Sequence, residues 1–257
     1  MKKSLFNTRA LITSAAIVSC AVHTAWAAPL YDPGLNTLPS AQGWTTQGLG
    51  PFSESVGAGR YRFETLTLNA TQAGSARLEA ASLNTLAGFT LDFNLRVVSE
   101  AHANSDRAGF SFIVTGQDPA DSLEIAFWGD HVWACTGSFA HGVDAAFDTG
   151  TTAHAYSLAV KNNAYVFAAD GAALFSAALV DYSARGAPYN LAGFVFFGDD
   201  TSSARSQVEM GGIALTPVPE PATTALLAAG LFVLAARRRL HHSRGIGLGR
   251  PSGSIAT

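Results

Sequence analysis

The sequence predicts an all-β protein, a sandwich of two sheets, flanked by a leader at the N-terminus and a membrane tail at the C-terminus. Three observations support this prediction. Short stretches of alternating apolar and polar residues recur through residues 30–216, separated by turn residues. No amphipathic helix of about a dozen residues stands among them. The two apolar runs that are too long for sandwich strands lie at the two ends of the chain.

The N-terminus has the three parts of a secretory signal peptide. Lys2 and Lys3 supply a basic start, residues 11–22 form an apolar stretch, and Ala25-Trp26-Ala27 is a small-residue cleavage site. We therefore expect signal peptidase to remove residues 1–27 and the mature chain to begin at Ala28. Export follows from this prediction.

The chain contains two cysteines, Cys20 and Cys135. Residues 17–20 also loosely match a lipoprotein box, so acylation of Cys20 is an alternative to cleavage after Ala27. Removal of the leader leaves Cys135 alone, which excludes an intrachain disulfide. We expect Cys135 to be a buried small residue in a strand rather than a nucleophile.

The domain between the ends, residues 28–216, contains two strands with a clear two-residue period. In residues 60–65 the apolar positions are Tyr61 and Phe63, and in residues 89–96 they fall on every second residue from Phe89 to Leu95. Further strands are predicted at 76–81, 109–115, 123–128, 132–135, 155–161, 164–169, 173–179, 194–197 and 207–215. Asn162-Asn163 and Asp170-Gly171 are suited to tight hairpins because these residues tolerate positive φ.

Charge is unevenly distributed along the chain. Residues 30–216 hold eight Lys and Arg against eighteen Asp and Glu, a formal net charge of −10. Nucleic-acid binding depends on clustered Lys and Arg, so the acidic domain argues against that function. Polysaccharides, cations and proteins remain as partners.

The C-terminal forty residues combine three features in order. Val218-Pro219-Glu220-Pro221 precedes an uncharged apolar run at 222–236, which Arg237-Arg238-Arg239 follows. As a helix the run would be roughly 22 Å long at about 1.5 Å per residue, a short membrane span whose arginines favour a cytoplasmic C-terminus. The Gly- and Ser-rich residues 241–257 are expected to be disordered.

This order of features resembles the PEP-CTERM sorting domain of Gram-negative bacteria over residues 217–240. The resemblance implies recognition of Pro219, Glu220 and Pro221 by an exosortase, a membrane-embedded processing enzyme associated with exopolysaccharide production. The chain departs from the usual pattern because it continues for another 17 residues after Leu240.

Two weaker resemblances concern the central domain. Residues 156–160, 164–168 and 170–175 are similar to the late hairpins of concanavalin-like jelly rolls. Asp106–Phe110, Phe127-Trp128 and Gly198–Ala204 resemble an exported, surface-anchored domain without an established activity. The resemblances imply a jelly-roll-like sandwich.

Because jelly rolls of this kind include glucan hydrolases, the residues were compared with the acidic strand that such enzymes use, Glu-x-Asp-x-(x)-Glu. Glu124 is present, but Ala126 replaces the aspartate and Trp128 or Gly129 stands where the second glutamate belongs. The sequence therefore predicts a non-catalytic protein. The alternative is a surface glycan hydrolase with an unfamiliar site, for which Asp130, Glu124 and Glu209 are candidate acids.

Aromatic residues and acids provide the remaining candidate sites. Trp128 and Trp133 flank a predicted turn and are candidate glycan contacts, with burial in the core as the alternative. Asp199 and Asp200, with Asp130, offer oxygen ligands suited to Ca²⁺, with a structural turn as the alternative. No other cofactor is predicted.

The sequence thus predicts an exported protein, held in the inner membrane by its tail until an exosortase processes it. Its expected destination is the cell surface or the extracellular matrix of a biofilm. There we expect a structural or glycan-binding role in the exopolysaccharide layer.

Overall fold

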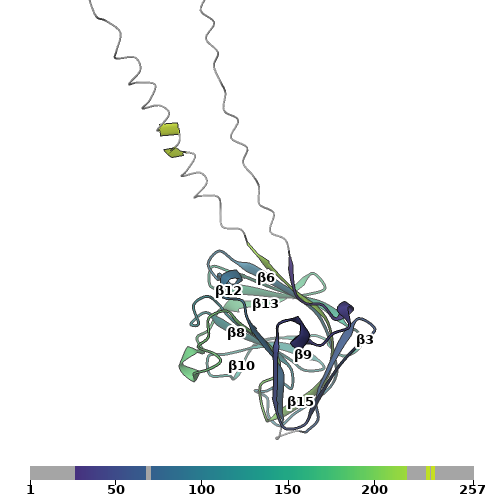
Figure 1. Ribbon diagram of the computed structural model, residues 1–257. Coiled ribbons are helices and arrows are strands. Elements are labelled where there is room, and N and C mark those ends of the chain that lie inside the picture. Colours follow the sequence, from purple (N-terminus) through teal and green to yellow (C-terminus); the bar gives the residue numbers. More distant parts are fainter. Residues whose placement is uncertain (1–26, 68–70, 219–229, 232, 235–257) are drawn as a thin grey trace, which may run out of the picture. The chain divides into compact units, whose positions relative to one another are not determined.

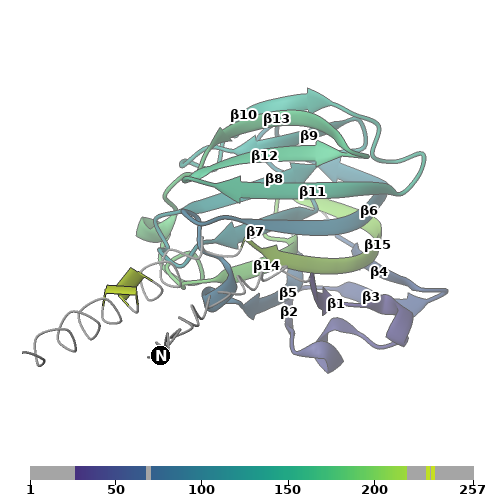
Figure 2. The ribbon, with the colours of Figure 1, turned by 90° about the horizontal axis from the view of Figure 1, so that it is seen from above.

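The structure is a computed structural model that describes residues 27–67, 71–218, 230, 231, 233 and 234. Two antiparallel sheets pack face to face, and Figures 1 and 2 show their strands running in two layers. Apart from strands, residues 27–67 and 71–218 form four short 3-10 helices: η1 (Pro33–Leu35), η2 (Pro39–Gln42), η3 (Ala80–Ser82) and η4 (Ser183–Arg185). The predicted all-β sandwich is confirmed.

Sheet A contains the longest strands of the domain. Its order is β13 (Ala172–Ala178), β12 (Ala164–Ala169), β11 (His154–Lys161), β6 (Phe89–His102), β15 (Ala204–Pro217), β4 (Arg60–Thr65) and β3 (Phe52–Gly57), and β1 (Ala28–Tyr31) also pairs with β15. The central pair, β6 and β15, joins segments about a hundred residues apart in the sequence. Long-range pairing of this kind is typical of two-sheet sandwiches.

Sheet B carries the candidate site on its outer face. Its order is β10 (His141–Ala146), β9 (His131–Cys135), β8 (Ser122–Phe127), β7 (Ser111–Thr115), β14 (Phe194–Asp199), β5 (Gln72–Leu78) and β2 (Thr45–Leu49). Because side chains alternate between faces, every second residue of these strands points away from sheet A.

Aromatic side chains fill the space between the sheets. Phe93 of β6 stacks on Phe112 of β7 with ring centroids 4.3 Å apart, and Tyr61 of β4 meets the edge of Phe197 of β14. The predicted inward positions of β4 and β6 are buried, as their two-residue period requires. Burial of such large rings contributes much of the stability of a core that has no disulfide.

Both predicted tight hairpins form. Asn162 and Asn163 connect β11 to β12, and Asp170 and Gly171 connect β12 to β13, all four with positive φ. Two successive residues of positive φ match the twist of the flanking strands, which is why Asn, Asp and Gly occupy these positions.

The predicted set of strands was incomplete, mostly in the first part of the domain. Strands β1, β2, β3 and β10 were not predicted, and the strand predicted at 76–81 is instead β5, which ends at Leu78 before η3. β2 and β3 are edge strands with few buried residues, so they lack a strong two-residue period.

The two ends of the domain lie beside each other in sheet A. Ala28 of β1 pairs with Leu215 of β15, and the Val218 N–H donates to the Gly88 carbonyl oxygen at 2.8 Å. Ala28, the expected first residue of the mature chain, is therefore the first residue of a strand. The chain is therefore bonded to the sandwich as far as Val218, the residue before Pro219.

Several predictions concern residues outside the described part. These are the leader with Cys20 and Ala25, the motif residues Pro219–Pro221, most of the membrane segment 222–236, Arg237–Arg239 and the tail 241–257. Among the residues that are described, no helix is long and apolar enough to cross a membrane.

Candidate functional site

The outer face of sheet B is divided into a covered half and an open half. Over β8 and β9, the connections 103–110, 136–140 and 179–193 pack against the sheet. They enclose a second, smaller apolar cluster: Ala108, Ala126, Trp133, Cys135 and Tyr182, with Trp128, Phe139, Val180 and Tyr189 around it. Over β5 and β2 the face is more open, with Gln47 exposed and Phe196 of the neighbouring β14 half-buried, whereas the outward side chains of β7 are buried.

Trp133 and Cys135 belong to the covered half. The Trp133 side chain is 0% exposed, and the ring of His141 stacks on it at a centroid distance of 4.3 Å. Trp133 is therefore a core residue, the alternative considered for it from the sequence, and it presents no surface for a sugar. Cys135 is also buried in its strand, and burial raises the pKa of its thiol, so it stays protonated.

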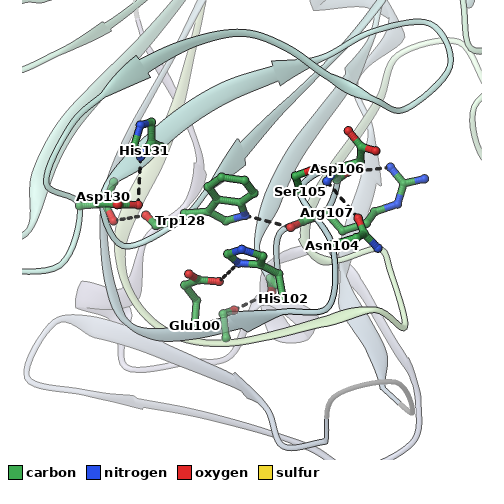
Figure 3. A network of polar contacts seen from close by, with 12 residues as sticks. Glu100, His102, Asn104, Ser105, Asp106, Arg107, Trp128, Asp130 and His131 are labelled. Carbon is green, nitrogen blue, oxygen red and sulfur yellow. Dashed lines mark hydrogen bonds and ion pairs between the residues drawn. The ribbon is translucent and has the colours of Figure 1, made fainter.

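Trp128 lies at the edge of the covered half and is half-buried. Its indole Nε1 donates to the Arg107 carbonyl oxygen at 2.9 Å, and the ring of His102 stacks on it at 4.3 Å (Figure 3). His102 is held in turn by Glu100, with Nδ1 and Oε2 2.9 Å apart. Figure 3 shows the indole between His102 and the loop that carries Arg107.

Three histidines surround Trp128 without forming a metal site. His102, His131 and His141 all approach the indole ring, at centroid distances of 4.3 to 6.3 Å. In the described ranges, no group of three or more His, Cys, Asp or Glu side chains has an arrangement that could hold a metal ion. The histidines act here as ring partners of the tryptophan.

An open groove of about 890 Å³ occupies the other half of the face. Its lining combines apolar, amide and acidic side chains: Thr45, Gln47, Gly48, Leu49, Gln72, Ala73, Gly74, Ala76, Ile113, Ala187, Pro188, Tyr189, Phe194, Phe196, Asp199 and Asp200. Strands β2, β5, β7 and β14 form its floor, and residues 187–189 form a wall.

The floor of the groove is aromatic. Phe194 and Phe196 point to the outer face of β14, whereas Val195 and Phe197 fill the inter-sheet core. The two rings are nearly parallel, 11° apart, and Phe196 is half-buried. Gly74 of β5 lies beneath Phe196, and a Cβ at residue 74 would overlap that ring. The glycine thus allows the ring to lie flat on the floor.

One end of the groove is acidic. Asp200 accepts from the Tyr189 hydroxyl at 3.3 Å and from the Ser111 hydroxyl at 3.4 Å. Glu124 of β8 is 4% exposed on the same outer face as Ser111, and its Oε2 has no hydrogen-bond partner. Burial, reinforced by the charge of Asp200, raises the pKa of Glu124 well above its usual range, and burial likewise raises the pKa of Asp200.

The three segments that resemble the exported, surface-anchored domain converge on this region. Asp106–Phe110 contacts Trp128 through the Arg107 carbonyl oxygen, Phe127 is the last residue of β8 with Trp128 directly after it, and Gly198–Ala204 carries Asp199 and Asp200. Residues scattered over nearly a hundred positions of sequence therefore meet at one end of the outer face of sheet B.

The remaining candidate acids lie elsewhere. Asp130 is in the β8–β9 turn with its Oδ1 3.0 Å from His131 Nδ1, and the interaction with this imidazole lowers the pKa of Asp130. Asp130, Asp199 and Asp200 are not arranged as a set of metal ligands in the described part of the chain. Calcium binding stays a prediction. Glu209 belongs to β15 of sheet A, where it pairs with Arg62 at 3.0 Å, so the three candidate hydrolase acids are not brought together.

Comparison with solved structures agrees with the fold. A carbohydrate esterase from the Shiga toxin-encoding bacteriophage phi24B is similar with a TM-score of 0.55 and 13% identity, over 76% of this chain and 100% of that chain. A protein of unknown function with a galectin-like fold from Bacillus subtilis has a TM-score of 0.49 and 10% identity, over 74% and 96%. At such identities the likeness concerns the fold alone. No curated protein matches the sequence.

A family model matches the end of the chain. Residues 217–239 match the model described as the PEP-CTERM protein-sorting motif, which implies exosortase-dependent export and membrane anchoring before processing. The match begins at Pro217, the last residue of β15. The chain is thus a jelly-roll-like sandwich that carries a PEP-CTERM sorting motif directly after its last strand.

Proposed function

We propose that this protein is a non-catalytic glycan-binding component of the cell surface or its exopolysaccharide layer, and that it binds glycan in the groove of sheet B. The observation that carries the proposal is the lining of the groove. A flat aromatic floor at Phe196 stands beside the amides of Gln47 and Gln72. Sugars have apolar faces that stack on rings and hydroxyls that bond to amides and carboxylates.

The position of the groove supports the same role. The floor consists of regular strands, which hold their side chains more rigidly than loops do. The groove is open along β2, which is the edge of sheet B, so an extended chain of sugars can pass over it without threading. A polymer ligand requires such an open groove.

Delivery to a polysaccharide layer fits the sorting motif. The resemblance to the PEP-CTERM sorting domain implies that an exosortase recognises Pro219, Glu220 and Pro221, in a system that accompanies exopolysaccharide production. An acidic domain of net charge −10 would also resist adsorption to anionic membrane surfaces.

The second candidate function, glycan hydrolysis, has one observation in its favour. Asp200 lines the groove, and its charge contributes to the raised pKa of Glu124, a second carboxyl group on the same outer face. Glycosidases use such pairs, but both members must reach the sugar. Glu124 is 4% exposed beneath the covering loops, which favours binding over hydrolysis.

The proposal is tested with two amide variants of the full chain in detergent micelles. Gln47→Ala removes an exposed amide from the groove, and Gln207→Ala removes a half-buried amide from β15 in the other sheet. On an oligosaccharide array, we expect the parent and Gln207→Ala to bind the same glycans. Gln47→Ala should bind them about 2- to 10-fold more weakly, since one hydrogen bond contributes about 0.5–1.5 kcal/mol.

Either of two results would contradict the proposal. In the first, no glycan binds the parent. In the second, glycan binds and both variants behave alike, which would place the binding surface elsewhere. Reducing-sugar release by the parent that disappears in Glu124→Gln would favour the hydrolase instead.

A further inference from the structure

The groove of sheet B is lined without a cationic side chain. Its lining residues in the described part of the chain include no Lys, Arg or His. Its hydrogen-bonding side chains are hydroxyl, amide and carboxyl groups: Thr45, Gln47, Gln72, Tyr189, Asp199 and Asp200. Proteins that recognise a carboxylate usually do so with Arg or Lys. The groove therefore offers no ion-pair partner to an anionic sugar.

Two arginines belong to neighbouring segments, but neither lines the groove. Arg77 is on the inward face of β5, where its guanidinium lies 5.4 Å from the centroid of the buried Trp44 ring. It also donates to the Leu30 carbonyl oxygen at 2.8 Å. Arg107 donates to backbone carbonyl oxygens in the covered half. Both guanidinium groups are thus engaged away from the groove.

A row of apolar side chains crosses the floor of the groove. Ile113 of β7, Phe196 of β14 and Ala76 of β5 lie directly opposite one another in the strand register. A sugar that stacks on this row loses water from the groups that face the floor. A hydroxymethyl, acetyl or methyl group tolerates this loss, whereas a carboxylate without a positive partner is strongly destabilised by it.

The amide at the edge of the groove suits hydroxyl groups rather than charges. Gln47 of β2 is exposed and lies opposite Gly74 of β5. Neighbouring strands are about 4.8 Å apart, so Gln47 is roughly 10 Å from β14, about the length of a disaccharide. An amide donates and accepts hydrogen bonds without charge, so it can bond to a hydroxyl or acetyl group of one sugar while another sugar stacks on Phe196.

The charge of the whole domain acts in the same direction. Residues 30–216 carry a formal net charge of −10. A negative domain repels a polyanion and lowers its rate of association, but salt screens this long-range effect. Exclusion of a carboxylate by direct contact with the groove is screened much less. The two effects are therefore separable by ionic strength.

We propose that the groove selects uncharged glycans, whose sugars carry hydroxyl, acetyl or methyl groups, and rejects polysaccharides rich in uronic acids. The inference rests on the proposed glycan-binding function and specifies the class of ligand. Three separate observations support it: the lining without cations, the apolar row across the floor and the amide at the edge.

The test compares two forms of one polymer, the exopolysaccharide of the producing cells. In the neutral form, every carboxyl group is reduced to a hydroxymethyl group. In the oxidised form, the C6 hydroxymethyl groups of the neutral form are converted to carboxylates, so the linkages are the same and the charge differs.

Binding to the full chain in detergent micelles is measured by co-sedimentation at two ionic strengths. These are about 0.15 M and about 1 M, between which the Debye length falls from about 8 Å to about 3 Å. We expect the parent to bind the neutral form at least about 10-fold more tightly at both ionic strengths, because the carboxylates meet an apolar floor and no cation.

Two lysine variants with the same change of net charge locate the effect. Gln47→Lys places a cation at the edge of the groove and should narrow the ratio of the two affinities by about 2- to 5-fold, the effect of one exposed ion pair. Gln207→Lys places the same cation on β15 of sheet A and should leave the ratio as in the parent. Thermal melting establishes that both variants are folded.

The outcomes separate this inference from the function on which it rests. Equal or tighter binding of the oxidised form by the parent would overturn the preference and leave glycan binding in place. A preference that disappears at about 1 M ionic strength, or that both lysine variants reduce equally, would assign it to the net charge of the domain and overturn the role of the groove. Failure of the parent to bind either form would overturn the proposed function itself.

Discussion

At the scale of single residues, Asp199 has the largest consequence for the pH dependence of folding. Its side chain is 1% exposed, and burial raises its pKa from 3.8 to about 8. Between those values the carboxyl group of the unfolded chain is ionised, whereas that of the folded chain keeps its proton. The folded state then binds more protons, so its stability falls as the pH rises.

This gives a prediction for Asp199→Asn. In the parent, the free energy of unfolding should decline from about pH 4 to about pH 8 and change little above that. The amide cannot ionise, so the variant should lose part of this decline and be more stable than the parent at pH 8. The rest of the decline should persist in the variant, because the raised pKa values of Glu124 and Asp200 also make the folded state less stable as the pH rises. Urea unfolding at several pH values measures the effect.

A suitable control is Asp130→Asn. Asp130 is exposed in the β8–β9 turn, and its interaction with the His131 side chain lowers its pKa. The ionised Asp130 carboxylate therefore stabilises the fold at neutral pH, and this contribution is lost as the pH falls. The direction is opposite to that expected for Asp199. This variant should therefore retain the decline between pH 4 and pH 8. A parent whose stability is constant across that range would contradict the account of Asp199.

Some residues of the candidate site could be identified from the sequence, and others could not. Glu124 was identified as a candidate hydrolase acid, and Asp199 and Asp200 as candidate Ca²⁺ ligands, because carboxyl side chains are easy to recognise in an apolar sequence. Phe196 was not among the candidate glycan contacts. The run Phe194–Phe197 is apolar at every position, so its period does not reveal which face meets the other sheet.

At the scale of elements, strands with one polar face could be predicted and edge strands could not. β4, β6 and the hairpins around β12 follow local rules of alternation and turn chemistry. β2 and β3 become strands through pairing with β5 and β4, a tertiary effect that leaves little trace in their own sequence. The groove could not be predicted for the same reason, since β2 forms its rim.

The last strand, β15, ends at Pro217, two residues before Pro219 of the sorting motif. Pro217 pairs with Phe89, and the Val218 N–H bonds to the Gly88 carbonyl oxygen, so Pro219 follows the sandwich without a spacer. In cells with the exosortase, we expect the intact mass of the mature protein to correspond to a chain that starts at Ala28 and ends near Pro219–Pro221. Glu220→Ala should leave a chain that extends to Thr257.

The control for this prediction is Glu64→Ala, which removes a glutamate from β4 in sheet A and should not affect processing. Deletion of the exosortase should leave the parent and Glu64→Ala extending to Thr257, as Glu220→Ala does in the presence of the enzyme. A chain that extends to Thr257 in the presence of the enzyme would show that the motif anchors the protein without being processed.

At the scale of the whole molecule, the fold class was predictable and the division of sheet B was not. Many short strands, no long helix and turn residues between them leave few alternatives to a sandwich. Which half of the outer face is covered depends on three connections, 103–110, 136–140 and 179–193, that pack by tertiary contacts. Trp133 is buried and Phe196 lines a groove as a result of that packing.

The central claim, that the groove binds extracellular polysaccharide, is tested most directly by co-sedimentation with the exopolysaccharide of the producing cells. The full chain and Phe196→Leu are compared, because leucine keeps an apolar side chain over Gly74 but removes the flat ring. We predict that the parent sediments with the polysaccharide and that Phe196→Leu, folded equally well, sediments several-fold less. A parent that stays in the supernatant, or a variant that sediments as fully as the parent, would contradict the claim.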